Sequence, residues 1–240
     1  MKNQIVLLTI LLCSAASCAQ WGKRISGNGN IVTIERNTSD YEEIACYGSF
    51  DYILLAGTEG KLKIEGEENL LEYIITEVKD GKLIVKTEKG INLSTSRKKT
   101  IKIFIPFKDI EKVSLAGSGD IISKAPINTD EFDVNLTGSG DITLDIFANE
   151  IESNLTGSGD ITLTGKTTDL KLTITGSGDY SCYGLSAENT EVSISGSGDM
   201  EVVSNSNLKI RVTGSGDVSY KGNPAKEDTK VTGSGSISKR

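Results

Sequence analysis

The sequence predicts an all-β protein, folded as a right-handed parallel β-helix with about 19–20 residues in each coil. The main observation is a repeat: Gly-Ser-Gly-Asp occurs six times, and Gly233-Ser234-Gly235-Ser236 closes the series. Successive first glycines are 21, 19, 19, 20, 18 and 19 residues apart. A nearly fixed period of this length indicates structural units that stack on one another. The six copies begin at Gly117, Gly138, Gly157, Gly176, Gly196 and Gly214.

The second observation is a register that repeats from copy to copy. Side chains alternate along a strand with period two, which places the apolar residues around each motif on one face with its two glycines. The residue after each motif is apolar or aromatic: Ile121, Ile142, Ile161, Tyr180, Met200, Val218 and Ile237. The residue two before each motif is also apolar: Leu115, Leu136, Leu155, Ile174, Ile194, Val212 and Val231. We expect both columns to form the core. The inward glycines require either a narrow corner or a positive φ, and both explanations stay open.

The rest of each period contains alternating stretches separated by Gly, Asn, Thr and Asp, which predicts two or three short strands per coil. The hexapeptide rhythm of left-handed β-helices is missing from these stretches, so the right-handed form is preferred. With coils ~4.8 Å apart, the six steps from Gly117 to Gly233 predict a rod section about 29 Å long.

Residues 113–238 form the regular coils of this prediction, and residues 19–112 form a less regular, strand-rich N-terminal part. Here Gly27–Asn30 and Gly48–Asp51 look like degenerate copies of the motif. The remainder is expected to form wider coils or a small sheet that caps the open end of the stack. The expected strands are 52–56, 61–65, 74–78, 82–87 and 100–105, with a helical turn at 68–71.

Residues 1–18 have the features of a signal peptide of the lipoprotein type, with a positive charge at Lys2, a short apolar run and small residues before the exit. We therefore expect export, as an outer-membrane lipoprotein or as a periplasmic or extracellular protein. Residues 15–18 resemble a bacterial lipobox, which would make Cys18 the lipidated N-terminus and a membrane anchor. Ordinary cleavage after Ala19 also satisfies the small-residue rule, and both routes stay open.

Composition excludes several classes of function. The formal net charge is −7, and it becomes −8 without Lys2, so nucleic acid is not an expected partner. The chain contains no histidine, which removes the usual general base and the commonest zinc ligand. Cys46 and Cys182 fall in core columns about seven coils apart, too far for a disulfide, and are expected to be buried free thiols.

One outward column is the candidate functional site. Alternation exposes the motif serines and, beside them, Asp120, Asp141, Asp160, Asp179, Asp199 and Asp217. Stacked carboxylates ~5 Å apart repel by about 0.8 kcal/mol per neighbour in water, so each needs a compensating contact. One explanation is hydrogen bonding to nearby backbone amides in Asx-type turns. The alternative is a row of Ca²⁺ sites, although each coil supplies one carboxylate where Ca²⁺ takes six to eight oxygens. No other cofactor is expected, and no catalytic residue is assigned.

The same residues resemble a known family. Repeated Gly-Ser-Gly-Asp-Ile coils, a Gly-x-Gly-Asn-Ile opening and a lipobox-like Cys18 are similar to the auto-transporter adhesin head domains of the GIN type, which are common in Bacteroidetes-like bacteria. The resemblance covers about residues 25–238. It implies a right-handed β-helix in the cell envelope, and it provides no catalytic residues to transfer.

The sequence therefore predicts a non-enzymatic envelope protein with an adhesin-like or scaffold role, whose partner is an envelope protein or a glycan. A Ca²⁺-binding structural module is one alternative. A polysaccharide-active β-helix enzyme is another, but such enzymes need one singular acidic cluster, whereas the acids here are spread evenly. Sugar sites usually contain an exposed aromatic side chain, and Tyr47 and Tyr183 are the candidates, since Tyr180 and Tyr220 fall in core columns.

Overall fold

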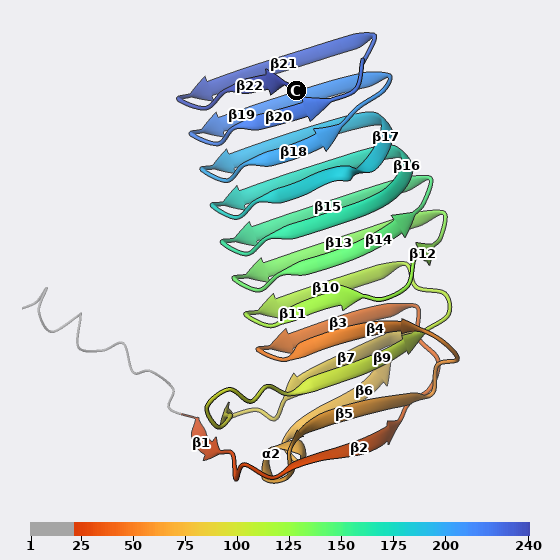
Figure 1. The fold of residues 1–240 in the computed structure, drawn as a ribbon, viewed down its shortest axis with the longest axis vertical. Coiled ribbons are helices and arrows are strands. Elements are labelled where there is room, and N and C mark those ends of the chain that lie inside the picture. Colours follow the sequence, from red (N-terminus) through yellow and green to blue (C-terminus); the bar gives the residue numbers. More distant parts are fainter. Residues whose placement is uncertain (1–21) are drawn as a thin grey trace, which may run out of the picture.

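The computed structural model describes residues 22–240, and it shows a rod of stacked β-coils (Figure 1). Parallel pairing between successive coils confirms the predicted β-solenoid. The signal peptide and Cys18 lie outside the described residues. Within residues 22–240, no helix is long and apolar enough to cross a membrane.

Each coil contains two strands that meet at the Gly-Ser-Gly-Asp motif, so the chain reverses at a sharp corner there. These corners lie along one long edge of the rod, and the chain passes from one coil to the next at the opposite edge (Figure 1). The first sheet contains the strands that end at the motif: β3 (Glu43–Gly48), β10 (Lys112–Gly117), β13 (Glu131–Gly138), β15 (Glu150–Gly157), β19 (Asn207–Gly214) and β21 (Lys226–Gly233).

The second sheet contains the strands that follow the motif. They are β4 (Asp51–Ala56), β11 (Asp120–Ser123), β14 (Ile142–Phe147), β18 (Met200–Val203), β20 (Val218–Lys221) and β22 (Ile237–Lys239). The long strands β16 (Ile161–Gly176) and β17 (Tyr180–Gly196) pass from the second sheet into the first. The short strand β12 (Ile127–Asn128) pairs with the end of β14.

The core lies between the two sheets and follows the predicted columns. The residue after each motif pairs with its equivalent in the next coil, from Ile121 to Ile237. The column from Leu115 to Val231 is also continuous. In every coil before the one formed by β21 and β22, both columns are buried. Each coil supplies a few apolar side chains, and stacking joins them into one continuous core.

The first coil comes from an earlier segment than the repeat suggests. Strands β3 and β4 lie directly against β10 and β11, and Gly48 pairs with Gly117. Gly48–Asp51 therefore takes the place of a motif, as expected. Gly27–Asn30 does not, and that prediction was wrong. This segment lies in the loop before β2, where Gly27 packs against the side chain of Glu67.

The chain before the first coil, together with the chain between the first and second coils, forms a cap at the N-terminal end. On the second sheet, β2 (Ile31–Asn37), β5 (Lys61–Glu67) and β9 (Lys102–Phe107) pair antiparallel, and β9 joins β4. On the first sheet, β6 (Ile74–Lys79) pairs antiparallel with β7 (Lys82–Thr87), which joins β3. The packed-sheet alternative is therefore the correct one. The helical turn α2 (Glu68–Leu71) and the parallel pair β1 (Lys23–Ser26) and β8 (Ile91–Ser94) complete the cap.

The two described cysteines are free and buried, as predicted. Their separation was overestimated, because residues 57–111 form the cap and add no coils between them. Cys46 lies in β3, on the first coil. Cys182 lies in β17, four coils further along the rod. Four steps of ~4.8 Å still exceed the ~7 Å that a disulfide spans.

Candidate functional site

The motif corner is narrow enough that its glycines have two separate reasons to be glycine. The first glycine of each motif has a positive φ, for example 133° at Gly157. The second glycine has no such strain, but a Cβ at Gly159 would lie 2.0 Å from the carbonyl oxygen of Gly140 in the preceding coil. Both explanations from the sequence therefore apply: the first glycine has the positive φ and, as at Gly157, also lies against the preceding coil, whereas the second glycine has only the close contact.

The motif aspartates form a hydrogen-bonded ladder along this corner. The amide of Asp160 donates to Oδ1 of Asp141 at 3.1 Å, and the amide of Asp179 donates to Oδ1 of Asp160 at 3.1 Å. The same bond links every successive pair in the column from Asp120 to Asp217. Each carboxylate thus accepts a backbone amide, as expected, but the donor belongs to the next coil and not to an Asx turn.

The last copy of the motif ends the ladder. Ser236 occupies the aspartate position and donates both its amide and its hydroxyl to Asp217, at 2.7 and 2.9 Å. No coil follows within the described chain, so a carboxylate at this position would have no amide to accept.

The ladder gives the aspartates a scaffold role. Residues 22–240 contain no group of three or more His, Cys, Asp or Glu side chains arranged to hold a metal ion. Each carboxylate compensates one backbone amide that the close glycine packing leaves without a carbonyl partner. The repeated chemistry therefore joins coil to coil, and we propose that it needs no Ca²⁺.

Substitutions at Asp160 separate the role of its acceptor oxygen from the role of its negative charge. Asp160→Ala removes an acceptor from the amide of Asp179, so we expect the free energy of unfolding to fall by about 1 kcal/mol. Asp160→Asn keeps an acceptor oxygen and removes a repelling charge, so it should match or slightly exceed the wild type. Denaturant titrations followed by circular dichroism measure both. If Asn destabilised as much as Ala, the negative charge itself would be required.

Two surface hollows of the described residues lie away from this corner. A groove of about 480 Å³ crosses five neighbouring strands of the first sheet, from β15 to β21. It lies toward the edge opposite to the motif corners. Its lining comes from residues 18–20 apart in sequence, which parallel pairing places side by side. The polar lining residues include Glu150, Asp169, Lys171, Asn189, Glu191, Asn207, Lys209, Lys226 and Asp228.

The polar side chains of the groove are largely paired with one another. Lys209 bonds Glu191 at 2.7 Å, and Lys171 bonds Glu152 at 3.0 Å. Asn189 donates to Asp169 at 2.8 Å, and Asn207 donates to Asn189. The hydrogen bond to Glu152 raises the pKa of Lys171, which keeps this ammonium protonated. The polar side chains of the groove are therefore bonded mainly to side chains of adjacent coils.

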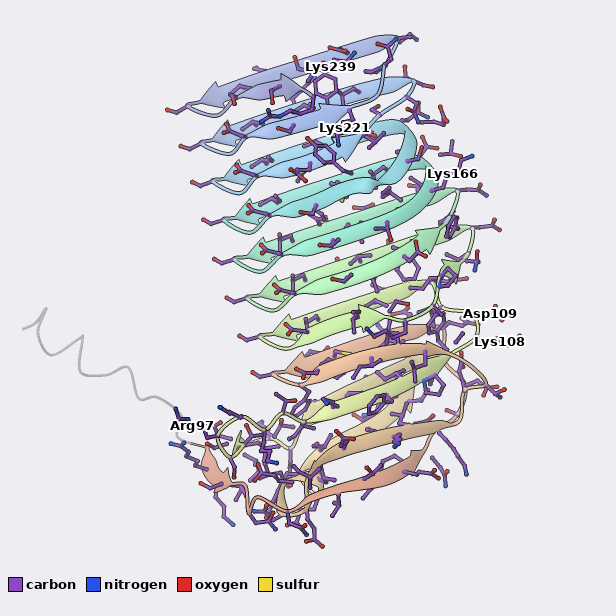
Figure 2. The ribbon with its side chains drawn as sticks, viewed as in Figure 1. Arg97, Lys108, Asp109, Lys166, Lys221 and Lys239 are labelled. Carbon is purple, nitrogen blue, oxygen red and sulfur yellow. The ribbon has the colours of Figure 1, made fainter. Side chains whose placement is uncertain are left out.

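A second hollow, of about 500 Å³, lies beside the first coil and is strongly acidic. Its lining includes Asp40, Glu42, Asp80 and Asp109, together with Lys108, and Figure 2 shows Lys108 and Asp109 at the edge opposite to the sharp corners. Glu59 has a structural part in this hollow, since it accepts the amides of Tyr41 and Lys108 at 2.8 and 3.1 Å. This cluster was not predicted, because its members come from four separate loops.

The two aromatic candidates differ in exposure. The side chain of Tyr47 is 44 % exposed. Tyr183 was expected to be exposed, but it is partly covered, and the Lys221 ammonium lies 3.9 Å from its ring centroid. Tyr180 and Tyr220 are buried, as predicted. Tyr47 lies near the cap, far from the groove, so the aromatic side chains do not converge on one sugar site.

The chain belongs to the family described as "Putative auto-transporter adhesin, head GIN domain", whose model matches residues 40–224. This confirms the resemblance seen in the sequence. None of the curated proteins matches the chain.

Several solved structures share the fold, among them the following three. A putative adhesin from Bacteroides fragilis is 24% identical, with a TM-score of 0.79, and the match covers 90% of this chain and 100% of that one. A putative lipid binding protein from Parabacteroides distasonis is 29% identical, with a TM-score of 0.69 and coverage of 91% and 100%. A putative adhesin from Parabacteroides merdae is 23% identical, with a TM-score of 0.68 and coverage of 91% and 99%.

Proposed function

We propose that this protein is a non-enzymatic component of a bacterial cell envelope that is exported and binds a partner in an adhesin-like or scaffold role. Membership of an adhesin-like envelope family supports export and an envelope location. If Cys18 is lipidated, the N-terminal end of the rod is held at a membrane; otherwise the protein is periplasmic or extracellular.

The observation that carries the proposal is how the polar groups are used. The motif aspartates are bonded to the next coil, and the main charged residues of the groove are bonded to their neighbours. An enzyme of the polysaccharide-active class needs instead a convergent acid and base with perturbed pKa values. Binding needs only a shaped, hydrogen-bonding surface, and the groove offers one across five coils.

The groove favours an extended polar partner, such as a glycan chain or an extended envelope polypeptide. Five strands spaced ~4.8 Å apart give a groove about 19 Å long, which is several sugar units or residues. Amides, carboxylates and ammonium groups alternate along it, so both donors and acceptors are available.

An array of envelope glycans and envelope proteins, probed with residues 22–240, tests this function. We expect a polymeric ligand to bind and the double variant Asn207→Ala/Lys209→Ala to weaken binding roughly tenfold, through the loss of two polar contacts. Lys166→Ala is the matched control, because Lys166 is exposed and lies outside the groove. New reducing ends in a bound glycan would show catalysis and contradict the proposal.

A further inference from the structure

The coil formed by β21 and β22 leaves two strand edges without partners among the described strands. Among the described strands, β21 pairs only with β19, and β22 pairs only with β20. All eight residues of β21 are exposed. A free edge of this kind presents a row of N–H and C=O groups that another strand can pair with.

The side chains of this edge are a mixture of polar and apolar groups. Glu227 and Thr229 continue the core columns of Leu208 and Ile210, so the core becomes polar at this point. Glu227 accepts the hydroxyl of Tyr220 at 3.1 Å, which compensates its carboxylate. Val231 stays 36 % exposed at the end of the apolar column. The edge is therefore neither a closed cap nor an aggregation-prone apolar strand.

The free edge lies at the far end of the rod from β1, where the described chain begins (Figure 1). We propose that two copies of this protein join head to head at this edge, with β21 pairing antiparallel to β21 of the second copy. The two-fold axis runs perpendicular to the rod and crosses both sheets. The same rotation brings β22 opposite β22 of the second copy, so both sheets continue across the contact.

Alternation and charge together favour one register. Inward residues must face inward residues, which restricts the two-fold axis to passing through a residue of β21 rather than between two residues. An axis at Asp228 would place that carboxylate against its own copy, and an axis at Lys230 would place two ammonium groups together. An axis at Thr229 pairs each Asp228 with Lys230 of the second copy.

This contact rests on the proposed envelope role, and it names a second copy as one partner. The N-terminal ends of the two rods point away from each other in a head-to-head pair. Rods held at their N-terminal ends on two facing surfaces would therefore meet tip to tip. The interface is small, so a single pair should be weak, and many rods on one surface would add their contacts.

Complementary charge variants test the register. Sedimentation of residues 22–240, from micromolar to millimolar concentration, should show a dimer for the wild type. Lys230→Asp and Asp228→Lys each place like charges together twice, and each should weaken self-association roughly tenfold or more. Mixing the two variants restores both opposite pairs, so the mixture should form a heterodimer. Circular dichroism reports whether each variant stays folded, which matters because Asp228 also pairs with Arg211.

A cysteine at the axis gives an independent test. Thr229→Cys should form an intermolecular disulfide under mild oxidation, whereas Thr232→Cys, three residues from the axis, should not; the native Cys46 and Cys182 are buried and do not compete. A protein that stays monomeric throughout, or a dimer that neither the charge variants nor Thr229→Cys affects, would overturn the proposal. Such a failure would leave glycan or protein binding in the groove untouched, so the two proposals fail separately.

Discussion

Replacement of Gly159 by alanine is expected to remove more than about 4 kcal/mol from the free energy of unfolding, which is at the extreme of single substitutions. The new Cβ would lie 2.0 Å from the oxygen, 3.0 Å from the carbon and 3.1 Å from the nitrogen of Gly140. All three are backbone atoms of the preceding coil, which cannot move without parting the ladder. Denaturant unfolding followed by circular dichroism measures the loss.

Gly81→Ala is the matched control for this prediction. Gly81 has a positive φ of 73°, but a Cβ there would meet nothing within 4 Å. Its substitution should therefore cost only the strain of a left-handed conformation, about 1 kcal/mol. If Gly159→Ala were as mild as Gly81→Ala, coil-to-coil contact could not be the reason for the second motif glycine.

Glu67→Ala should have the second largest effect, a loss of about 3 kcal/mol, because three hydrogen-bond donors lose one buried carboxylate. Only 1 % of Glu67 is exposed. It accepts the amide of Gly29, together with the amide and the hydroxyl of Ser96, at 2.5, 2.8 and 2.6 Å. These bonds hold the segment before β2 and the loop after β8 against α2 and β5. Thermal unfolding, with hydrogen exchange at the cap, measures the effect.

The same carboxylate makes the cap sensitive to acid. Burial alone would raise the pKa of Glu67, but the hydrogen bonds from Ser96 and Gly29 outweigh it and lower the pKa below 4.5. A lowered folded-state pKa stabilises the protein above the unfolded value and loses that contribution as the pH falls through the folded value. Glu67→Gln removes this titration. The stability difference between wild type and Glu67→Gln should therefore shrink below pH 4.5, and a constant difference would contradict this role.

The coil stack could be predicted from sequence because its determinants are local and repeated. The Ile142 and Leu136 columns follow from strand alternation, and each copy of the motif confirms the frame of the others. The donor to each motif aspartate could not be predicted, because Asx turns and inter-coil bonds use the same residues. Only the distance between coils at the glycines decides between them.

The capping sheet was one of two predicted alternatives, but its place between the first two coils, and the groove, escaped prediction for a different reason. Residues 57–111 carry ordinary strand and turn signals, and these do not reveal that β3 will skip this segment to pair with β10. The missed insertion also caused the error in the spacing of Cys46 and Cys182. The groove joins residues 18–20 apart whose importance lies only in their stacking, so no single motif marks it. The sequence around Glu67 also contains no motif that would predict a buried carboxylate at this position.

The central claim is that the Gly-Ser-Gly-Asp columns join one coil to the next without metal. Thermal unfolding of residues 22–240 with millimolar Ca²⁺ and with a chelator tests it most directly. A site filled at 100 times its Kd would add about 2.7 kcal/mol, or roughly 5–10 °C for a chain of this size. We expect the two melting temperatures to agree. A Ca²⁺-dependent rise of that size, abolished by Asn at Asp141, Asp160 and Asp179, would contradict the claim.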